Sequence, residues 1–313
     1  MGSVGVVLQA MGFFWDLSWH RDFGRESSFS PPHIVVLAGL FIGGVVAVWR
    51  VWRTPSAAYR HPLGGGRLLL VGVVCEILGL WWDDLWHHLF GLDLDAGLWS
   101  PPHLTVILGV WIQAAGCVTA ALSDEPRARP GSAYLAAGAL LASVAPIFGP
   151  IEYMPTHRDP FLYPILMAFA AAFVLFAGRT AVNQPWGCTI VAVLYSLVRG
   201  VPTLLLWLSG SMVSGYPTPL VVPAMLADWI LNRPATSSRR TAILAGGVFG
   251  LLPFLEWPVV NWVASHQWPV YHWPVDVPLL ALIPAALAGI SGGLLGRLTG
   301  GWARRTFASG GVA

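Results

Sequence analysis

Hydrophobic stretches recur along the whole chain, and short polar stretches or Pro- and Gly-containing breaks separate them. Each stretch spans about 20 residues, the length that a helix needs to cross the hydrocarbon core of a bilayer. The pattern predicts an all-α, polytopic membrane bundle with about ten transmembrane helices, of which the eighth is short. The expected limits are 3–20, 31–52, 67–88, 102–123, 132–152, 160–181, 186–208, 219–232, 241–264 and 276–298.

Composition supports a membrane location. Hydrophobic residues make up 56% of the 313 residues and charged residues 10%, whereas soluble domains carry about 25% charged residues. The lipid bilayer is therefore the expected environment, and little chain is left for a soluble domain. The net charge of +2 is too small to indicate a nucleic-acid partner.

The basic residues, all of them Arg, indicate the orientation. If the N-terminus is cytoplasmic, thirteen of the seventeen fall in the segments on the inner side, as the positive-inside rule requires. The sequence thus predicts an N-in, C-in protein of the inner membrane of a prokaryotic cell.

Histidine shows the opposite distribution. On this topology only His61 lies inside, and the other eight lie at outer helix ends or in outer loops. These are His20, His33, His87, His88, His103, His157, His266 and His272. A residue that is merely tolerated at the interface should occur on both sides, so the asymmetry points to a site at the outer face.

Two segments near the N-terminus share the pattern W-D-x-x-W-H…S-P-P-H. The first runs from Trp15 to His33 and the second from Trp82 to His103. A coincidence of this length is improbable, so we interpret the pattern as an internal repeat. It predicts two duplicated metal-binding hairpins, 1–60 and 67–123, within a region 1–123. Residues 124–313 form an additional helical region of the same membrane domain.

Each hairpin brings three potential ligands together. An Asp and a His four residues apart lie on the same helix face, and the Pro-Pro pair begins the next helix with a second His in its first turn. The expected metal ligands are Asp16, His20 and His33 in the first hairpin and Asp83, His87 and His103 in the second.

Further polar residues extend these two groups. Gln9 and Glu76 lie seven residues before the Asp of each hairpin, on the same helical stripe, and we expect them to support the ligands. His157 and His272 are candidates to complete or enclose the cluster. The alternative is a hydrogen-bonded structural network among interfacial residues, with the Trp residues forming an aromatic belt, although an unpaired carboxylate near hydrocarbon is costly.

The run from Asp16 to His33, D-L-S-W-H-R-D-F-G-R-E-S-S-F-S-P-P-H, resembles the copper-site hairpin in the C subunit of the particulate methane and ammonia monooxygenases. That hairpin has an Asp, a His four residues on and another His thirteen further. Ser-Trp precedes its first His, and an Arg-acidic pair and F-[ST]-P-x precede its second. The matching positions are Asp16, Ser18, Trp19, His20, Arg25, Glu26, Phe29, Ser30, Pro31 and His33.

The resemblance implies copper held by Asp16, His20 and His33. It also implies a second metal site one hairpin later, where Asp83, His87 and His103 occupy similar places. Asp83 stands where the family has Asn, and the spacer between the two histidines is longer here. The close match covers 18 residues and the looser one roughly residues 1–123. Other monooxygenase subunits are the partners that it implies, and a homo-oligomer is the alternative.

The ligand types favour copper, with zinc or iron as alternatives. Neither group contains Cys or Met, which argues against a dedicated Cu(I) shuttle. The leading hypothesis is a copper-dependent membrane monooxygenase or oxidoreductase subunit that acts at the metal sites on a small hydrophobic substrate, with a quinol as electron donor. The alternatives are a non-catalytic copper-binding or copper-delivery membrane protein and a haem or quinone membrane subunit.

Overall fold

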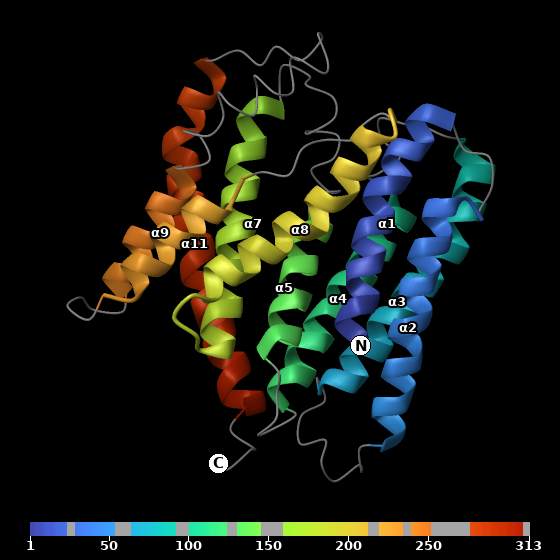
Figure 1. Cartoon of the computed structure of the whole chain (residues 1–313), viewed down its shortest axis with the longest axis horizontal. Helices are drawn as coiled ribbons and strands as arrows, with labels where there is room; N and C mark the ends of the chain where they lie inside the picture. The colour runs from blue at the N-terminus through green and yellow to red at the C-terminus, as the bar shows by residue number, and fades with distance from the viewer. Residues whose placement is uncertain are drawn as a thin grey trace. The chain divides into compact units, whose positions relative to one another are not determined.

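A computed structural model of the chain describes residues 1–23, 29–53, 64–91, 100–123, 130–144, 159–211, 219–233, 239–251 and 276–308. Every element in these ranges is a helix, which confirms the all-α prediction for this part of the chain. The helices are α1 (Gly2–Phe23), α2 (Pro31–Arg53), α3 (Gly65–Phe90), α4 (Pro101–Ser123), α5 (Pro130–Val144), α7 (Asp159–Val182), α8 (Gly187–Leu208), α9 (Val221–Leu231), α11 (Asp276–Ala303) and the π-helical turn η4 (Arg304–Ala308) (Figure 1). Residues 239–251 are also helical.

Proline and glycine set the ends of the helices that carry the candidate ligands. Pro31 and Pro101 are the first residues of α2 and α4, positions where the missing N–H group costs no hydrogen bond. Gly91 caps the C-terminus of α3 with φ of 76°, a left-handed conformation that favours glycine over residues with a Cβ. The helices on either side of each turn therefore begin and end within a few residues of the predicted limits.

Five helical segments are long and apolar enough to cross a membrane. They are Pro31–Arg53, Pro101–Ser123, Pro164–Val182, Gly187–Leu208 and Leu280–Phe307. Two shorter apolar helices, Gly131–Ser143 and Val221–Leu231, fall below that length. The chain therefore has the helices of a membrane protein. The two helices that carry the acidic residues of the candidate sites, α1 and α3, are not among the five.

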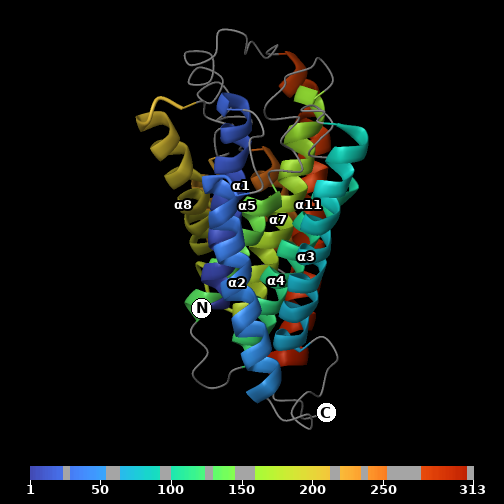
Figure 2. The ribbon, with the colours of Figure 1, turned by 90° about the vertical axis from the view of Figure 1, so that its right-hand side faces the viewer.

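The chain divides into two units, and the division passes through α8. Unit 1 comprises Met1–Pro150, Val201–Ser214 and Arg305–Ala313, and it contains both candidate metal-binding hairpins. In it α1 packs against α2 and α3 against α4, while α5 packs against α1 and α4, and two views of the ribbon show the pairs side by side (Figure 2). The prediction of a separate region 1–123 is not decided by this division, because α5 belongs to the same unit.

Glycines allow close helix packing in both hairpins, and they do so in matching places. A Cβ added at Gly12 of α1 would lie 2.7 Å from Val36 Cγ2 of α2, and one added at Gly79 of α3 would lie 2.7 Å from Val106 Cγ2 of α4. Small residues at such contacts let helix backbones approach each other in membranes. The repeat therefore extends from the ligand residues into the packing of each hairpin.

Unit 2 comprises Ile151–Gly200 and Gly215–Arg304. Its α7 and α11 pack along their length, where Gly292 and Gly296 of α11 lie against the backbone of Phe169 and Phe173 of α7. Asp228 of α9 is fully buried and accepts hydrogen bonds from Arg179 of α7 and from residues at the start of α8. These contacts join three helices of the unit.

Candidate metal centre

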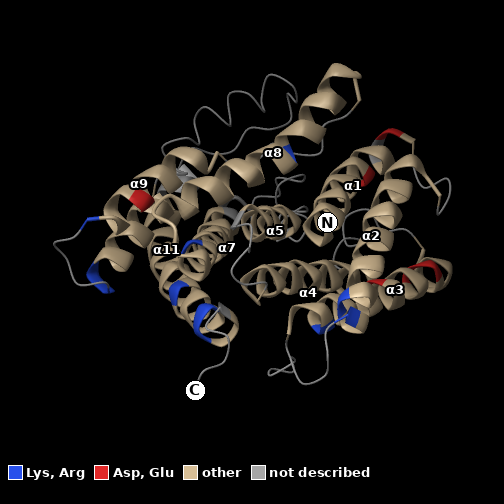
Figure 3. Cartoon of the chain, turned by 60° about the horizontal axis from the view of Figure 1, so that its bottom comes forward, with Lys and Arg blue, Asp and Glu red and all other residues tan. Residues whose placement is uncertain are grey.

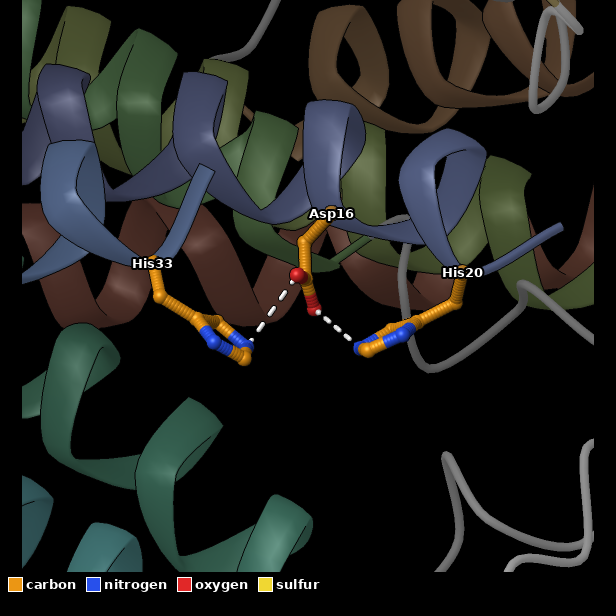
Figure 4. A group of neighbouring side chains, drawn as sticks. All are labelled: Asp16, His20 and His33. Atoms are coloured by element: carbon orange, nitrogen blue, oxygen red, sulfur yellow. Dashed lines mark ion pairs between the residues drawn. The ribbon is translucent and has the colours of Figure 1, made fainter. Parts of the chain in front are cut away.

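The first hairpin brings Asp16, His20 and His33 together. Asp16 Oδ2 lies 3.3 Å from His20 Nε2, and Asp16 Oδ1 lies 3.1 Å from His33 Nε2. The carboxylate thus stands between two imidazoles, one from its own helix α1 and one from the first turn of α2 (Figure 4). The ring centroids of the two histidines are 5.8 Å apart. The predicted convergence of these three side chains is confirmed.

The second hairpin repeats this arrangement with Asp83, His87 and His103. Asp83 Oδ1 lies 3.2 Å from Nε2 of both histidines, and the ring centroids are 5.6 Å apart. One difference separates the groups, because the histidines of the second share a single carboxylate oxygen while those of the first face one oxygen each. The aspartates are nearly equally shielded, with side chains 18% exposed at Asp16 and 17% at Asp83.

Aromatic residues flank both groups in the same geometry. Trp15 and Trp19 meet edge to face with centroids 6.4 Å apart, as Trp82 and Trp86 do at 6.2 Å. One turn on, Trp19 packs on Phe23 at 4.5 Å and Trp86 on Phe90 at 4.3 Å. The Trp residues that we interpret as an aromatic belt thus also form a row of contacting rings along each helix that carries an Asp ligand.

Both groups fit a metal ion by donor type and spacing. In each, one carboxylate oxygen and two imidazole nitrogens lie within 4.8 Å of one another. Metal–ligand bonds of about 2.0–2.2 Å place neighbouring donors about 3.3 Å apart in tetrahedral geometry, and the Asp-to-His distances are 3.1–3.3 Å. Three protein ligands would leave at least one coordination position open.

The second group also shows which nitrogen of each histidine would bind. His87 Nδ1 lies 3.2 Å from the carbonyl oxygen of Gly91, and this oxygen only accepts, so Nδ1 carries a proton. Its Nε2 faces the carboxylate of Asp83, a second acceptor. With Nδ1 as the donor to Gly91, a neutral imidazole turns the lone pair of Nε2 toward Asp83, which is the arrangement of a metal-binding histidine.

A serine holds the other histidine of this group. Ser100 Oγ lies 3.0 Å from His103 Nδ1 and accepts a hydrogen bond from the His103 backbone N–H. Such bonds to the remaining ring nitrogen fix the orientation of metal-binding histidines. Ser100 and Gly91 are contributions that the sequence pattern did not assign, although the Ser of S-P-P-H in both repeats was a visible signal.

Gln9 and Glu76 lie on the expected helices, but within the described residues their side-chain contacts are with Gln113 and not with the candidate ligands. Both are fully buried and reach Gln113 of α4, the first through a contact of 3.5 Å and the second through a hydrogen bond from the Gln113 amide. The expectation that they support the ligands stays a prediction. Gln113 was missed at the sequence level, although an amide inside an apolar span is a recognisable sign of an interior polar contact.

The remaining histidine predictions divide into two kinds. His88 lies 3.9 Å from Asp84, and these side chains are 77% and 59% exposed, so both lie on the surface. His157 and His272 lie outside the described residues, as do His61 and His266.

Comparison of the chain with protein-family models, with curated proteins and with solved structures finds no match in any of the three. The resemblance to the monooxygenase C subunit therefore rests on the residues of the hairpins alone.

Proposed function

We propose that this chain is a copper-binding protein of the prokaryotic inner membrane that acts as a monooxygenase-like oxidoreductase, alone or as one subunit. The observation that carries the proposal is the duplicated Asp-His-His group, in which both imidazoles of each hairpin turn Nε2 toward the same carboxylate. Copper heads the affinity order of divalent metals for nitrogen and oxygen ligands. Copper would supply one-electron redox chemistry with dioxygen at its open coordination position.

The chain's own residues would prepare that chemistry. Asp16 and Asp83 would place one negative charge beside each ion, and the histidines would supply neutral nitrogen ligands of moderate softness. Gly91 and Ser100 hold the rings of His87 and His103 by their Nδ1 atoms. This leaves Nε2 of each ring directed at the ion, so the ligands need little rearrangement on binding.

The distribution of charge supports sites at the outer face. In α2 the basic residues Arg50 and Arg53 lie in the last turn, at the opposite end from His33. In α3 Arg67 lies in the first turns, at the opposite end from Asp83 and His87. Figure 3 shows the acidic residues on α1 and α3 and the basic residues at these other helix ends. With basic ends cytoplasmic, both groups face outward, in the proposed N-in, C-in topology of ten spans.

An apolar groove on α2 and α3 supports the proposal of a small hydrophobic substrate. It has a volume of about 640 Å³, and Leu37, Phe41, Gly44 and Trp49 of α2 and Ile77 of α3 are among its lining residues. This volume lies within the usual range for small-molecule sites, about 300–1,000 Å³. Leu37 is one helical turn after His33 and so lies on the same face of α2. A molecule entering from the bilayer could follow this groove toward the first group.

The proposal is tested on purified protein, first by metal analysis and then by oxygen consumption with a quinol and a short-chain hydrocarbon. We expect copper in the isolated protein and hydrocarbon-dependent oxygen uptake that His33→Ala abolishes, while the His88→Ala control retains both. Copper without turnover would instead assign the chain to copper binding or delivery. A Soret band in the optical spectrum, with no copper, would assign it to the haem proteins and end the proposal.

A further inference from the structure

Three fully buried polar side chains are linked by hydrogen bonds between the two hairpins. Gln9 of α1, Glu76 of α3 and Gln113 of α4 are each 0% exposed. The Gln9 Nε2 group donates to Gln113 Oε1 at 3.5 Å, and the Gln113 Nε2 group donates to Glu76 Oε2. Gly43 of α2 gives this amide its room, because a Cβ there would lie 2.5 Å from Gln113 Oε1. The hairpins are thus joined by hydrogen bonds between buried side chains.

Glu76 has no charged partner in the described part of unit 1. Its Oε2 accepts a hydrogen bond from the Gln113 side-chain amide, and its Oε1 has no hydrogen-bond partner among the described residues. The titratable and charged groups of the helices packed against α3 are His33, Arg50 and Arg53 on α2 and His103 and Cys117 on α4. None of them bonds to Glu76. A carboxylate buried with a neutral amide alone is strongly disfavoured and takes up a proton instead.

We infer that Glu76 is a proton-binding group inside the membrane domain, and that it exchanges its proton in step with the charge at the Asp83 centre. The ligand is a single proton, which converts the carboxylate to a carboxylic acid. Gln9 and Gln113 can accommodate both forms, because each amide offers a donor and an acceptor that interchange on rotation. With Glu76 ionised, amide N–H groups point toward it. With Glu76 protonated, its O–H donates to the Gln113 oxygen, and the hydrogen bonds among the three side chains run in the opposite direction.

The link to the Asp83 centre rests on the proposed function. Glu76 and Asp83 lie two turns apart on α3, about 10 Å along the helix axis. If Asp83, His87 and His103 hold copper, its reduction by one electron from an added reductant would remove one positive charge from this site. The fraction of Glu76 that is ionised beside the Cu(II) charge would then bind a proton from the solvent, which restores part of the lost positive charge. At 10 Å the added charge changes the ratio of ionised to protonated Glu76 roughly tenfold.

The proton is tested without metal, by infrared spectroscopy of the purified protein at neutral pH in H₂O and D₂O. We expect a C=O stretching band of a protonated carboxyl that shifts in D₂O, is lost in Glu76→Gln and persists in Asp83→Asn. The Gln side chain has the same shape and can still bond to Gln113, so the variant should fold. Spectra that are identical for the wild type and Glu76→Gln in this region would overturn the inference.

The coupling is tested on protein loaded with Cu(II) and then reduced with ascorbate. We expect the Glu76-dependent band to grow on reduction in the wild type and to stay constant in His103→Ala, where the second centre is removed. A constant band in wild-type protein with bound copper at both centres would contradict the coupling. If the protein binds no copper, the proposed function fails, and the metal-free spectra still decide whether Glu76 carries a proton.

Discussion

Asp83 Oδ1 lies 3.2 Å from Nε2 of His103, on a different helix, and within the same distance of Nε2 of His87 on its own helix. The first hairpin places Asp16 Oδ1 at 3.1 Å from His33 Nε2 in the corresponding way. An aspartate close to two imidazoles, one from each arm of a hairpin, is therefore the shared feature of both groups. The predictions below concern this feature and the packing that maintains it.

Ser100 should strengthen metal binding at the second group, because its hydroxyl holds His103 by Nδ1. We expect Ser100→Ala to weaken copper binding there by about 10- to 100-fold, the usual effect of losing such a partner. Thr105→Ala is the matched control, since among the described residues this exposed hydroxyl bonds to the carbonyl of Pro101 and to no histidine. Competition titration with a copper chelator measures both. Equal affinities in the two variants would show that Ser100 does not orient the ligand.

Gly79 should be essential for the packing of α3 on α4. A Cβ there would lie 2.7 Å from Val106 Cγ2 and 2.8 Å from the Val106 backbone nitrogen, so we expect Gly79→Ala to destabilise the protein by about 1–3 kcal/mol. Gly44→Ala is the control, because among the described residues its Cβ would meet Val73 Cγ1 alone, at the ordinary contact distance of 3.7 Å. Both variants gain helix propensity equally. Thermal unfolding in detergent should lower Tm for Gly79→Ala alone, and equal Tm values would refute this packing.

Gly44 also allows a direct test of the apolar groove that it lines. Gly44→Phe should fill the groove at little cost to packing, because Val73 is the one described residue near the position of the new Cβ. We expect it to raise KM for a short-chain hydrocarbon while copper content stays at the wild-type level. Steady-state oxygen uptake and metal analysis give both quantities. An unchanged KM would exclude the groove as a substrate route.

Asp228 should stabilise unit 2, because its buried carboxylate bonds to Arg179 Nε at 3.0 Å and to the Thr189 backbone N–H and hydroxyl at 2.8 Å each. Removing one partner of such a pair costs about 3–5 kcal/mol. We expect Asp228→Ala to lower Tm markedly and to expose Cys188 to thiol reagents. Asp84→Ala, at an exposed side chain, should change stability by less than about 0.5 kcal/mol. A protected Cys188 and a wild-type Tm in Asp228→Ala would contradict this role.

Much of the fold follows from local sequence. The starts of α2 and α4 at Pro31 and Pro101 lie within one residue of the predicted limits. The start of an apolar stretch and a proline at the first position of a helix can both be recognised in the local sequence. The ligand groups were predictable for the same reason, since Asp and His four residues apart must share a helix face. Five segments meet the length and hydropathy of a membrane span, and the count of ten spans stays a prediction.

Contacts between the hairpins could not be read in the same way. Gln9, Glu76 and Gln113 come from three helices, and nothing in their spacing indicates that the amide of Gln113 lies between the other two. The orientation of His87 likewise depends on a carbonyl that the positive φ of Gly91 places nearby. Such features depend on tertiary packing and backbone conformation, which periodicity does not encode.

The most direct test of the account is the amount of copper bound per chain, measured by elemental analysis on the wild type, His33→Ala, His103→Ala and the double variant. The account predicts two ions in the wild type, one in each single variant and none in the double variant, with helix content unchanged by circular dichroism. Copper content that stays the same in all four proteins would contradict it.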